Sequence, residues 1–269
     1  MRKSSSTSWI CWAMSKPDGL VRLDKYLADC LGQTRTQVKD LIRGGRVTSG
    51  GEVLTRPELK VSPGLAIEVD GKPTGQAEPF VYYLLNKPQG VVSATEDPRQ
   101  RTVLDLLPPH PRRSLFPVGR LDKDTEGLLL ITDDGALAHA LLSPKYHVDK
   151  VYLILARGIA TQEHADRIAQ GIGIGQGEQA LPAKLEILET DIKDNTSRLR
   201  MTIHEGKFHQ VKRMIAACGM EVLALKRVRM GPLSLPEELS PGQYRLLTQE
   251  EKKSLENCVR KGVSGDGSP

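Results

Sequence analysis

A ten-residue stretch rich in glycine and proline, DGKPTGQAEP at residues 70–79, divides the chain into two blocks of unequal length. The stretch has no apolar periodicity, which predicts a linker rather than a helix or strand. Because 269 residues are enough for two domains, we expect each block to build its own core. The predicted organisation is a disordered extension at 1–19, a small domain at 20–71, the linker at 72–79, a large domain at 80–250, and a helix end with a tail at 251–269.

The composition is that of an ordinary globular protein, with 39% hydrophobic and 26% charged residues. No apolar run approaches the roughly 20 residues that a membrane helix needs, so we expect no membrane partner. The four cysteines form neither a CxxC pair nor a dense disulfide framework, which favours the reducing cytoplasm. No HExxH sequence or zinc spacing of cysteine and histidine occurs, so we expect no metal site.

The small block is distinguished by the grouping of its basic residues, not by a large net charge. The whole chain has 38 lysines and arginines against 33 acids, a net charge of +5 that is only suggestive of nucleic acid. Apolar residues at helical spacing over 23–31 and 38–42 predict two short helices. Four cations at steps of four, four and three would share one helix face: Arg35, Lys39, Arg43 and Arg46. Such a strip either binds an RNA phosphate backbone or is a solvated face balanced by nearby acids.

The large block mixes strands and helices without regular βαβ alternation. Strands are predicted at 81–85, 128–132 and 198–203, and helices at 136–142, 161–170 and 208–218. This mixture predicts an α+β domain with a mostly antiparallel sheet.

The segment GRLDKDTEG at 119–127 is the densest chemical signal, and the residues alone leave four interpretations open. A calcium loop would need a helix on each side, whereas both flanks are predicted to be extended. Asp122 and Asp124 could form the carboxylate pair of a glycosidase, although nothing marks a sugar site. The segment could also be a polar turn between strands, or it could carry a single catalytic carboxylate.

The wider sequence resembles a known enzyme family. GRLD at 119–122 is similar to the motif of pseudouridine synthases, and Gly127 with TDDG at 132–135 continues the likeness. LNKPQG at 85–90, the stretch from 143 to 152 and EGKFHQVKRM at 205–214 match further family segments in the same order. Residues 21–71 resemble the S4 RNA-binding module. Together they are most similar to the S4-containing pseudouridine synthases of small-subunit ribosomal RNA.

The resemblance implies a reaction that isomerises uridine without a cofactor. Asp122 would be the catalytic carboxylate, acting either as a nucleophile or by removing a proton. Lys212 would pair with it where relatives often have arginine, and an ammonium lacks the bidentate fork of a guanidinium. Arg213 stays open as a second candidate, and an exposed basic helix face would explain both cations equally well.

Three further residues acquire roles from the same resemblance. Tyr152 would be a further catalytic residue that stacks on the target uracil and could relay a proton, or else be a core aromatic of its strand. Arg120 would fill the gap left by a flipped base or hold a phosphate, or else form a structural ion pair. His209 and Arg213 would contact RNA beside the catalytic group.

The expected partner is small-subunit ribosomal RNA or a partly assembled subunit, bound by a monomer. The alternative within the same chemistry is large-subunit RNA. The alternative outside it is a non-catalytic RNA-binding factor of ribosome assembly.

Overall fold

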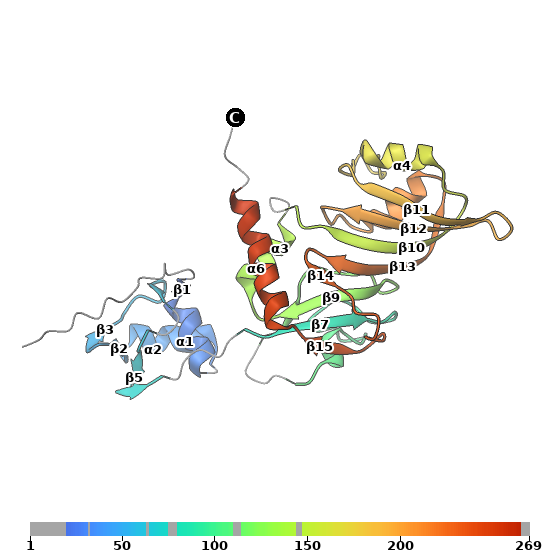
Figure 1. The fold of residues 1–269 in the computed structure, drawn as a ribbon. Helices are drawn as coiled ribbons and strands as arrows, with labels where there is room; N and C mark the ends of the chain where they lie inside the picture. Colours follow the sequence, from blue (N-terminus) through green and yellow to red (C-terminus); the bar gives the residue numbers. More distant parts are fainter. Residues whose placement is uncertain are drawn as a thin grey trace, which may run out of the picture. The chain divides into compact units, whose positions relative to one another are not determined.

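The computed structural model of the chain describes residues 20–31, 33–62, 65–74, 80–109, 114–143 and 147–264 (Figure 1). The predicted extension at 1–19, most of the predicted linker and the tail after residue 264 lie outside these ranges. The chain divides into two compact units at Pro79 and Phe80, and each unit is described by itself.

The small unit packs two helices beside short strands. Its helices are α1 (Leu23–Leu31) and α2 (Arg35–Arg43), and its strands are β1 (Val21–Arg22), β2 (Val47–Ser49), β3 (Glu52–Val53), β4 (Lys60–Val61), β5 (Glu68–Val69) and β6 (Lys72–Pro73). The strands form a sheet of order β3-β2-β5-β6 and a separate β1-β4 pair. The apolar residues that predicted the helices are the core, since Leu23, Leu27, Val38 and Ile42 are fully buried.

Two boundaries in this unit differ from the sequence prediction. Thr34 opens α2 with a capping box to Gln37, but the helix ends at Arg43 and Gly44 caps it. Arg46 therefore lies beyond the helix and does not continue its basic face. The residues Lys72 and Pro73, assigned to the linker, pair with β5 as the edge strand β6.

The large unit is built on one twisted sheet of nine strands. Its main order is β11-β12-β10-β13-β9-β7-β15, with β14 on β13 and β8 on β9. The strands are β7 (Tyr82–Lys87), β8 (Phe116–Pro117), β9 (Glu126–Thr132), β10 (Lys150–Arg157), β11 (Lys184–Asp191), β12 (Thr196–Ile203), β13 (Glu221–Met230), β14 (Leu233–Ser234) and β15 (Tyr244–Leu246). The strand pairs are antiparallel except β9 with β13, which is parallel. This confirms the predicted α+β class with a mostly antiparallel mixed sheet.

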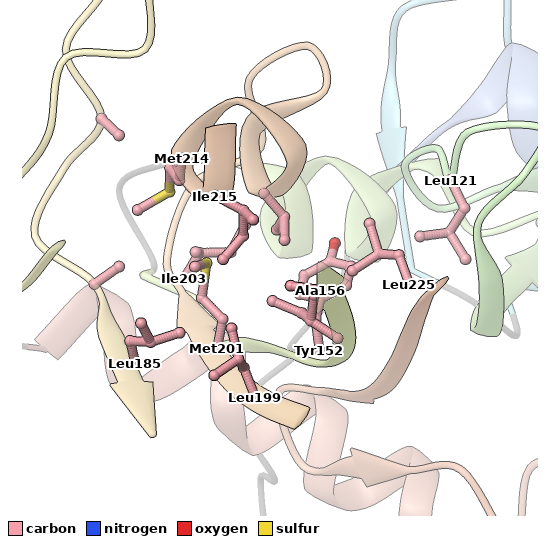
Figure 2. Close-up of a cluster of buried hydrophobic side chains, with 14 of the residues drawn as sticks. Leu121, Tyr152, Ala156, Leu185, Leu199, Met201, Ile203, Met214, Ile215 and Leu225 are labelled. Atoms are coloured by element: carbon pink, nitrogen blue, oxygen red, sulfur yellow. The ribbon is translucent and has the colours of Figure 1, made fainter. Parts of the chain in front are cut away.

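Helices cover the sheet and close two apolar clusters. They are the short 3-10 turn η1 (Leu104–Leu106) and α3 (Gly135–Leu142), α4 (Gln162–Ala169), α5 (Gln210–Ala217) and α6 (Gln249–Ser264). The larger cluster joins α4 and α5 to β10 and β12, and Figure 2 shows Met214 and Ile215 of α5 facing Met201 and Ile203 of β12. The second cluster joins α3 and α6 to β7 and β9. Strands β7 and β9 contribute to both clusters, which explains their unbroken apolar runs.

One helix start and one domain boundary in the large unit differ from the sequence prediction. The helix expected at 208–218 begins only at Gln210, because His209 is its N-cap in the left-handed conformation with φ 49°. The boundary expected at residue 250 falls inside α6, which starts at Gln249. The side chain of Leu255 on α6 is fully buried in the second cluster, so α6 belongs to the core of the large unit.

Candidate active site

The loop that carries Asp122 is fixed through its backbone on both sides. It spans 119–125, immediately before β9. The hydroxyl of Ser93 accepts a hydrogen bond from the Leu121 N–H at 3.0 Å and donates one to the Leu121 carbonyl at 2.8 Å. The Thr125 N–H donates to the Asp122 carbonyl at 3.1 Å, closing a turn. Asp122 is thus held as the first residue of a tight turn, with Lys123 and Asp124 at its tip.

The buried side chain of Lys87 stabilises this turn by hydrogen bonds to its backbone carbonyls. Lys87, at the end of β7, has no exposed surface, and its Nζ donates to the carbonyls of Thr125 at 2.8 Å, Asp122 at 2.9 Å and Pro88 at 3.1 Å. Burial lowers the pKa of Lys87 to about 8, although the negative charges of Asp122 and Asp124 act in the opposite direction. Sequence analysis assigned no role to Lys87. The available signal was a lysine closing the apolar run YYLLNK, where an unpaired charge would be costly to bury.

The carboxylate of Asp122 faces two basic groups. Its Oδ2 lies 3.1 Å from Nζ of Lys212, and its Oδ1 lies 3.5 Å from Nε2 of His209. Lys212 comes from the first turn of α5 and His209 from the residue that caps it. The side chains of Asp122 and Lys212 are 29% and 24% exposed, so this ion pair is largely shielded from solvent. The structure therefore brings together the two residues that the sequence paired.

A second carboxylate shares the lysine, which sequence analysis did not anticipate. Nζ of Lys212 donates to Oδ1 of Asp124 at 2.6 Å, although the Asp124 side chain is 71% exposed. The hydrogen bond to Lys212 lowers the pKa of Asp124 despite an opposing contribution from burial. Burial by itself would lower the pKa of Lys212, but its bonds to Asp124 and Asp122 outweigh that effect and raise it. The lysine is therefore a shared, firmly protonated cation.

A cavity opens beside Asp122. Tyr152 on β10 lines it and is only 7% exposed, so Tyr152 is both a member of the apolar cluster and a wall of the cavity. Figure 2 shows Tyr152 next to Leu225 of β13, with Leu121 nearby. Polar groups come from Arg120, which is exposed, and from the Asp122 ion pair. The cavity thus combines an aromatic and aliphatic wall with a charged mouth, which suits a planar polar ring.

Arg213 does not take the place that the sequence suggested. Its Nε donates to the Ile174 carbonyl at 2.8 Å and its Nη2 to the Gly175 carbonyl at 3.1 Å. Its Nη1 donates to the Phe208 carbonyl at 3.2 Å and pairs with Glu178 at 2.5 Å. All three guanidinium nitrogens of Arg213 are thus engaged by groups of the protein, which gives this residue a structural role, and its contact with RNA stays a prediction.

The four predicted RNA-binding cations of the small unit separate into two pairs. Arg35 pairs with Asp24 at 2.9 Å, and Arg46 pairs with Asp70 at 2.5 Å. Within the described residues, no such ion pair engages Lys39 or the exposed Arg43, which lie one turn apart on α2. Arg35 and Arg46 therefore also form ion pairs within their own unit, although both side chains stay about half exposed, and RNA binding by the four cations stays a prediction.

The described residues hold no group of three or more histidine, cysteine, aspartate or glutamate side chains that could bind a metal ion. Among the described helices, none is both long and apolar enough to cross a membrane.

Comparisons with known proteins agree with this geometry. Residues 81–217 match the family model described as RNA pseudouridylate synthase, and residues 21–67 match the S4 domain. The chain is 47% identical over 233 residues to YtzG, an uncharacterised RNA pseudouridine synthase of Bacillus subtilis (strain 168), covering 86% of this chain and 96% of the relative. It is 41% identical over 236 residues to ribosomal small subunit pseudouridine synthase A of Salmonella typhimurium, covering 87% and 100%.

A solved structure supports the same assignment. A crystal structure of a pseudouridylate synthase, 38% identical, aligns with a TM-score of 0.61 over 87% of this chain and 99% of that one. An S4 domain followed by a pseudouridylate synthase domain defines an RNA-modifying isomerase. The chain belongs to the RNA pseudouridylate synthase family.

Proposed function

We propose that this protein isomerises a specific uridine of small-subunit ribosomal RNA and that Asp122 is its catalytic carboxylate. The observation that carries the proposal is the 3.1 Å ion pair of Asp122 with Lys212 at the mouth of the Tyr152 cavity. The small-subunit substrate is inferred from the Salmonella typhimurium relative, which carries that activity in its name. The S4 match at residues 21–67 supports RNA as the partner.

The reaction requires one bond to break and one to form at the same ribose carbon. The bond from C1′ to N1 of uracil breaks, the uracil turns, and C1′ bonds to C5. The proton on C5 is then released and N1 gains a proton, so substrate and product are isomers and no redox partner is required. Asp122 assists either by attacking the ribose or by removing a proton, and both roles need a carboxylate fixed beside the sugar.

The surrounding residues follow from this assignment. A cavity lined by a buried tyrosine admits a uracil only when the nucleotide leaves its stack, so the target is flipped out. Tyr152 stacks on the flipped ring, and the exposed Arg120 at the mouth holds a phosphate or fills the vacated position. Lys212 keeps the carboxylate paired before substrate arrives and so reduces the reorganisation that the reaction requires.

The S4 unit supplies a second attachment to the same RNA. We assign residues 20–73 to it and 80–264 to the catalytic domain, so that the intervening residues tether two RNA-binding parts. Tethering raises the effective concentration of the catalytic domain at its target without new contacts. We infer a cytoplasmic monomer that acts on free RNA or on a partly assembled subunit.

The test is tritium release from ribosomal RNA labelled at C5 of uracil. Asp122→Asn should lower turnover by at least about 10³-fold, a modest share of a typical enzymatic acceleration. The matched control is Asp124→Asn, because Asp124 binds the same lysine but is mostly exposed, and it should retain turnover within about tenfold. Turnover of Asp122→Asn close to that of the native protein would refute the assignment of the carboxylate.

Substrate choice is read from the same assay. Release from small-subunit RNA, or only from the assembling particle, supports the proposal. Release from large-subunit RNA alone would support the proposed reaction but contradict the proposed small-subunit substrate. No release from any of these RNAs, with binding retained, would indicate a non-catalytic assembly factor.

A further inference from the structure

An aromatic ring projects into solvent next to the active site. Phe208 is 76% exposed, although the whole chain has only three phenylalanines. A single exposed apolar side chain is common on protein surfaces and needs no explanation by itself. Phe208 differs because its position is fixed by neighbours that also build the site.

The inner face of the ring is stacked on a residue of the catalytic cluster. The rings of Phe208 and His209 are nearly parallel, with centroids 3.7 Å apart and an interplanar angle of 19°. The same His209 lies 3.5 Å from Asp122 and lines the cavity. Phe208 thus extends the wall of the cavity outward by one ring, and its outer face remains open.

The backbone under this ring is held in a strained shape. His209 adopts a left-handed conformation with φ 49°, which non-glycine residues rarely occupy. The side chain of Gln210, only 3% exposed, accepts from the Lys207 N–H at 2.9 Å and donates to Glu205 at 2.9 Å. The Phe208 carbonyl accepts from Arg213. Hydrogen bonds on both sides therefore set the direction in which the ring points.

We propose that the outer face of Phe208 stacks on the base of a nucleotide adjacent to the target uridine. This inference rests on the proposed function, because a flipped uridine in the Tyr152 cavity leaves its neighbours at the rim. An aromatic face binds any base by stacking, and a base stacked there continues the column that His209 and Phe208 begin. The exposed cation at the rim, Arg120, favours a nucleic acid strand over an apolar protein segment.

Three substitutions separate stacking from simple apolar contact. Phe208→Tyr keeps an aromatic ring, Phe208→Leu keeps an apolar side chain of similar reach, and Phe208→Ala removes both. Loss of one base stack should weaken RNA binding about 5- to 150-fold, seen in KM and in the filter-binding Kd. Phe208→Leu and Phe208→Ala should both show this loss while kcat stays within about threefold, because the contact lies outside the reacting cavity. Phe208→Tyr should bind like the native protein, and all three should melt at the native temperature.

The decisive measurement removes the proposed stacking base from the RNA instead of the Phe208 ring from the protein. After primer extension locates the modified uridine, the base on its 5′ or its 3′ side is replaced by an abasic residue in ligated RNA. The native protein should bind one of the two abasic RNAs as weakly as the Phe208→Ala protein binds the intact RNA. For Phe208→Ala the same abasic RNA should cause little further loss, since the two changes remove one contact.

The outcomes distinguish this inference from the proposed function. Phe208→Leu binding like the native protein, or additive losses with both abasic RNAs, would overturn the stacking while leaving the enzyme assignment intact. Failure of the native protein to release tritium from any ribosomal RNA would overturn the proposed function, and the stacking with it.

Discussion

The backbone at Gly127 should tolerate no side chain. Gly127 lies where β9 starts its parallel pairing with β13, with φ 107° in a region that favours glycine. A Cβ at this position would overlap the carbonyl oxygen of Arg227 and lie 2.8 Å from the Arg227 nitrogen. Both neighbours are backbone atoms, so no side-chain rotation can relieve the contact. Gly127→Ala must therefore strain its own residue and push the two strands apart.

The size of the effect follows from these two costs. A non-glycine residue in such a backbone conformation costs about 1–3 kcal/mol. Displacing the two register pairs of the parallel junction, 126 with 226 and 127 with 227, costs about 1–3 kcal/mol more at typical net hydrogen-bond strengths. The expected loss of about 2–6 kcal/mol is a large part of the 5–15 kcal/mol that holds a typical domain.

Urea unfolding followed by circular dichroism measures this loss. With a slope of about 2 kcal/mol per molar, the midpoint should fall by about 1–3 M. Gly135→Ala is the matched control, because Gly135 opens α3 and a Cβ there would meet nothing within 4 Å. It should leave stability unchanged or raise it by up to about 1 kcal/mol. A Gly127→Ala protein within about 1 kcal/mol of the native protein would refute the reasoning, because the contact would then be relieved at little cost.

Further predictions concern the small unit and the support of the catalytic turn. The double variant Lys39→Ala with Arg43→Ala should leave turnover at saturating RNA unchanged and reduce the slope of log binding constant against log salt by roughly 2. Burial would raise the pKa of Asp24, but hydrogen bonds from Arg22 and Arg35 outweigh it and hold the pKa below 3.8. That stabilisation is therefore complete above pH 3.8 and is lost as pH falls through the lower folded value, so the small unit should unfold in acid. Asp24→Asn should remove about 1–3 kcal/mol at pH 7 and flatten this acid dependence, both seen in urea titrations at pH 7 and pH 3. Lys87→Met should abolish measurable turnover, because the Asp122 and Thr125 carbonyls of the turn lose their donor. An active variant would show that the turn holds without it.

Motifs with local spacing could be predicted from the sequence, and the structure keeps most of them. The pairing of Asp122 with Lys212 was accessible because both belong to recognisable segments, although 90 positions separate them. The apolar runs of β7 and β9 predicted buried strands for the same local reason. What the residues alone left open was whether Asp122 sat in a turn, a calcium loop or a catalytic site.

The remaining features depend on contacts that spacing does not encode. Arg213 neighbours Lys212 in sequence, but consecutive helix residues point about 100° apart, and this turns Arg213 toward the loop at 174–178. The ion pairs of Arg35 with Asp24 and of Arg46 with Asp70 join residues that are 11 and 24 positions apart, and no spacing rule predicts them. The left-handed cap at His209 shortened α5 and exposed Phe208, and no residue type at that position announces it.

The parallel junction of β9 and β13 has a consequence for how the enzyme fails on heating. Two register pairs join these strands, supported by the buried Arg227, whose Nε donates to the Leu128 carbonyl at 2.8 Å. The antiparallel pairs on either side are longer, with eight register pairs between β10 and β13 and six between β7 and β9. The Asp122 turn precedes one strand of this junction and α5 with Lys212 precedes the other, so opening the junction separates the ion pair while each half keeps its own ladder. Partial opening of this kind costs less than global unfolding. We expect catalysis to disappear reversibly at a temperature below that at which the circular dichroism signal is lost.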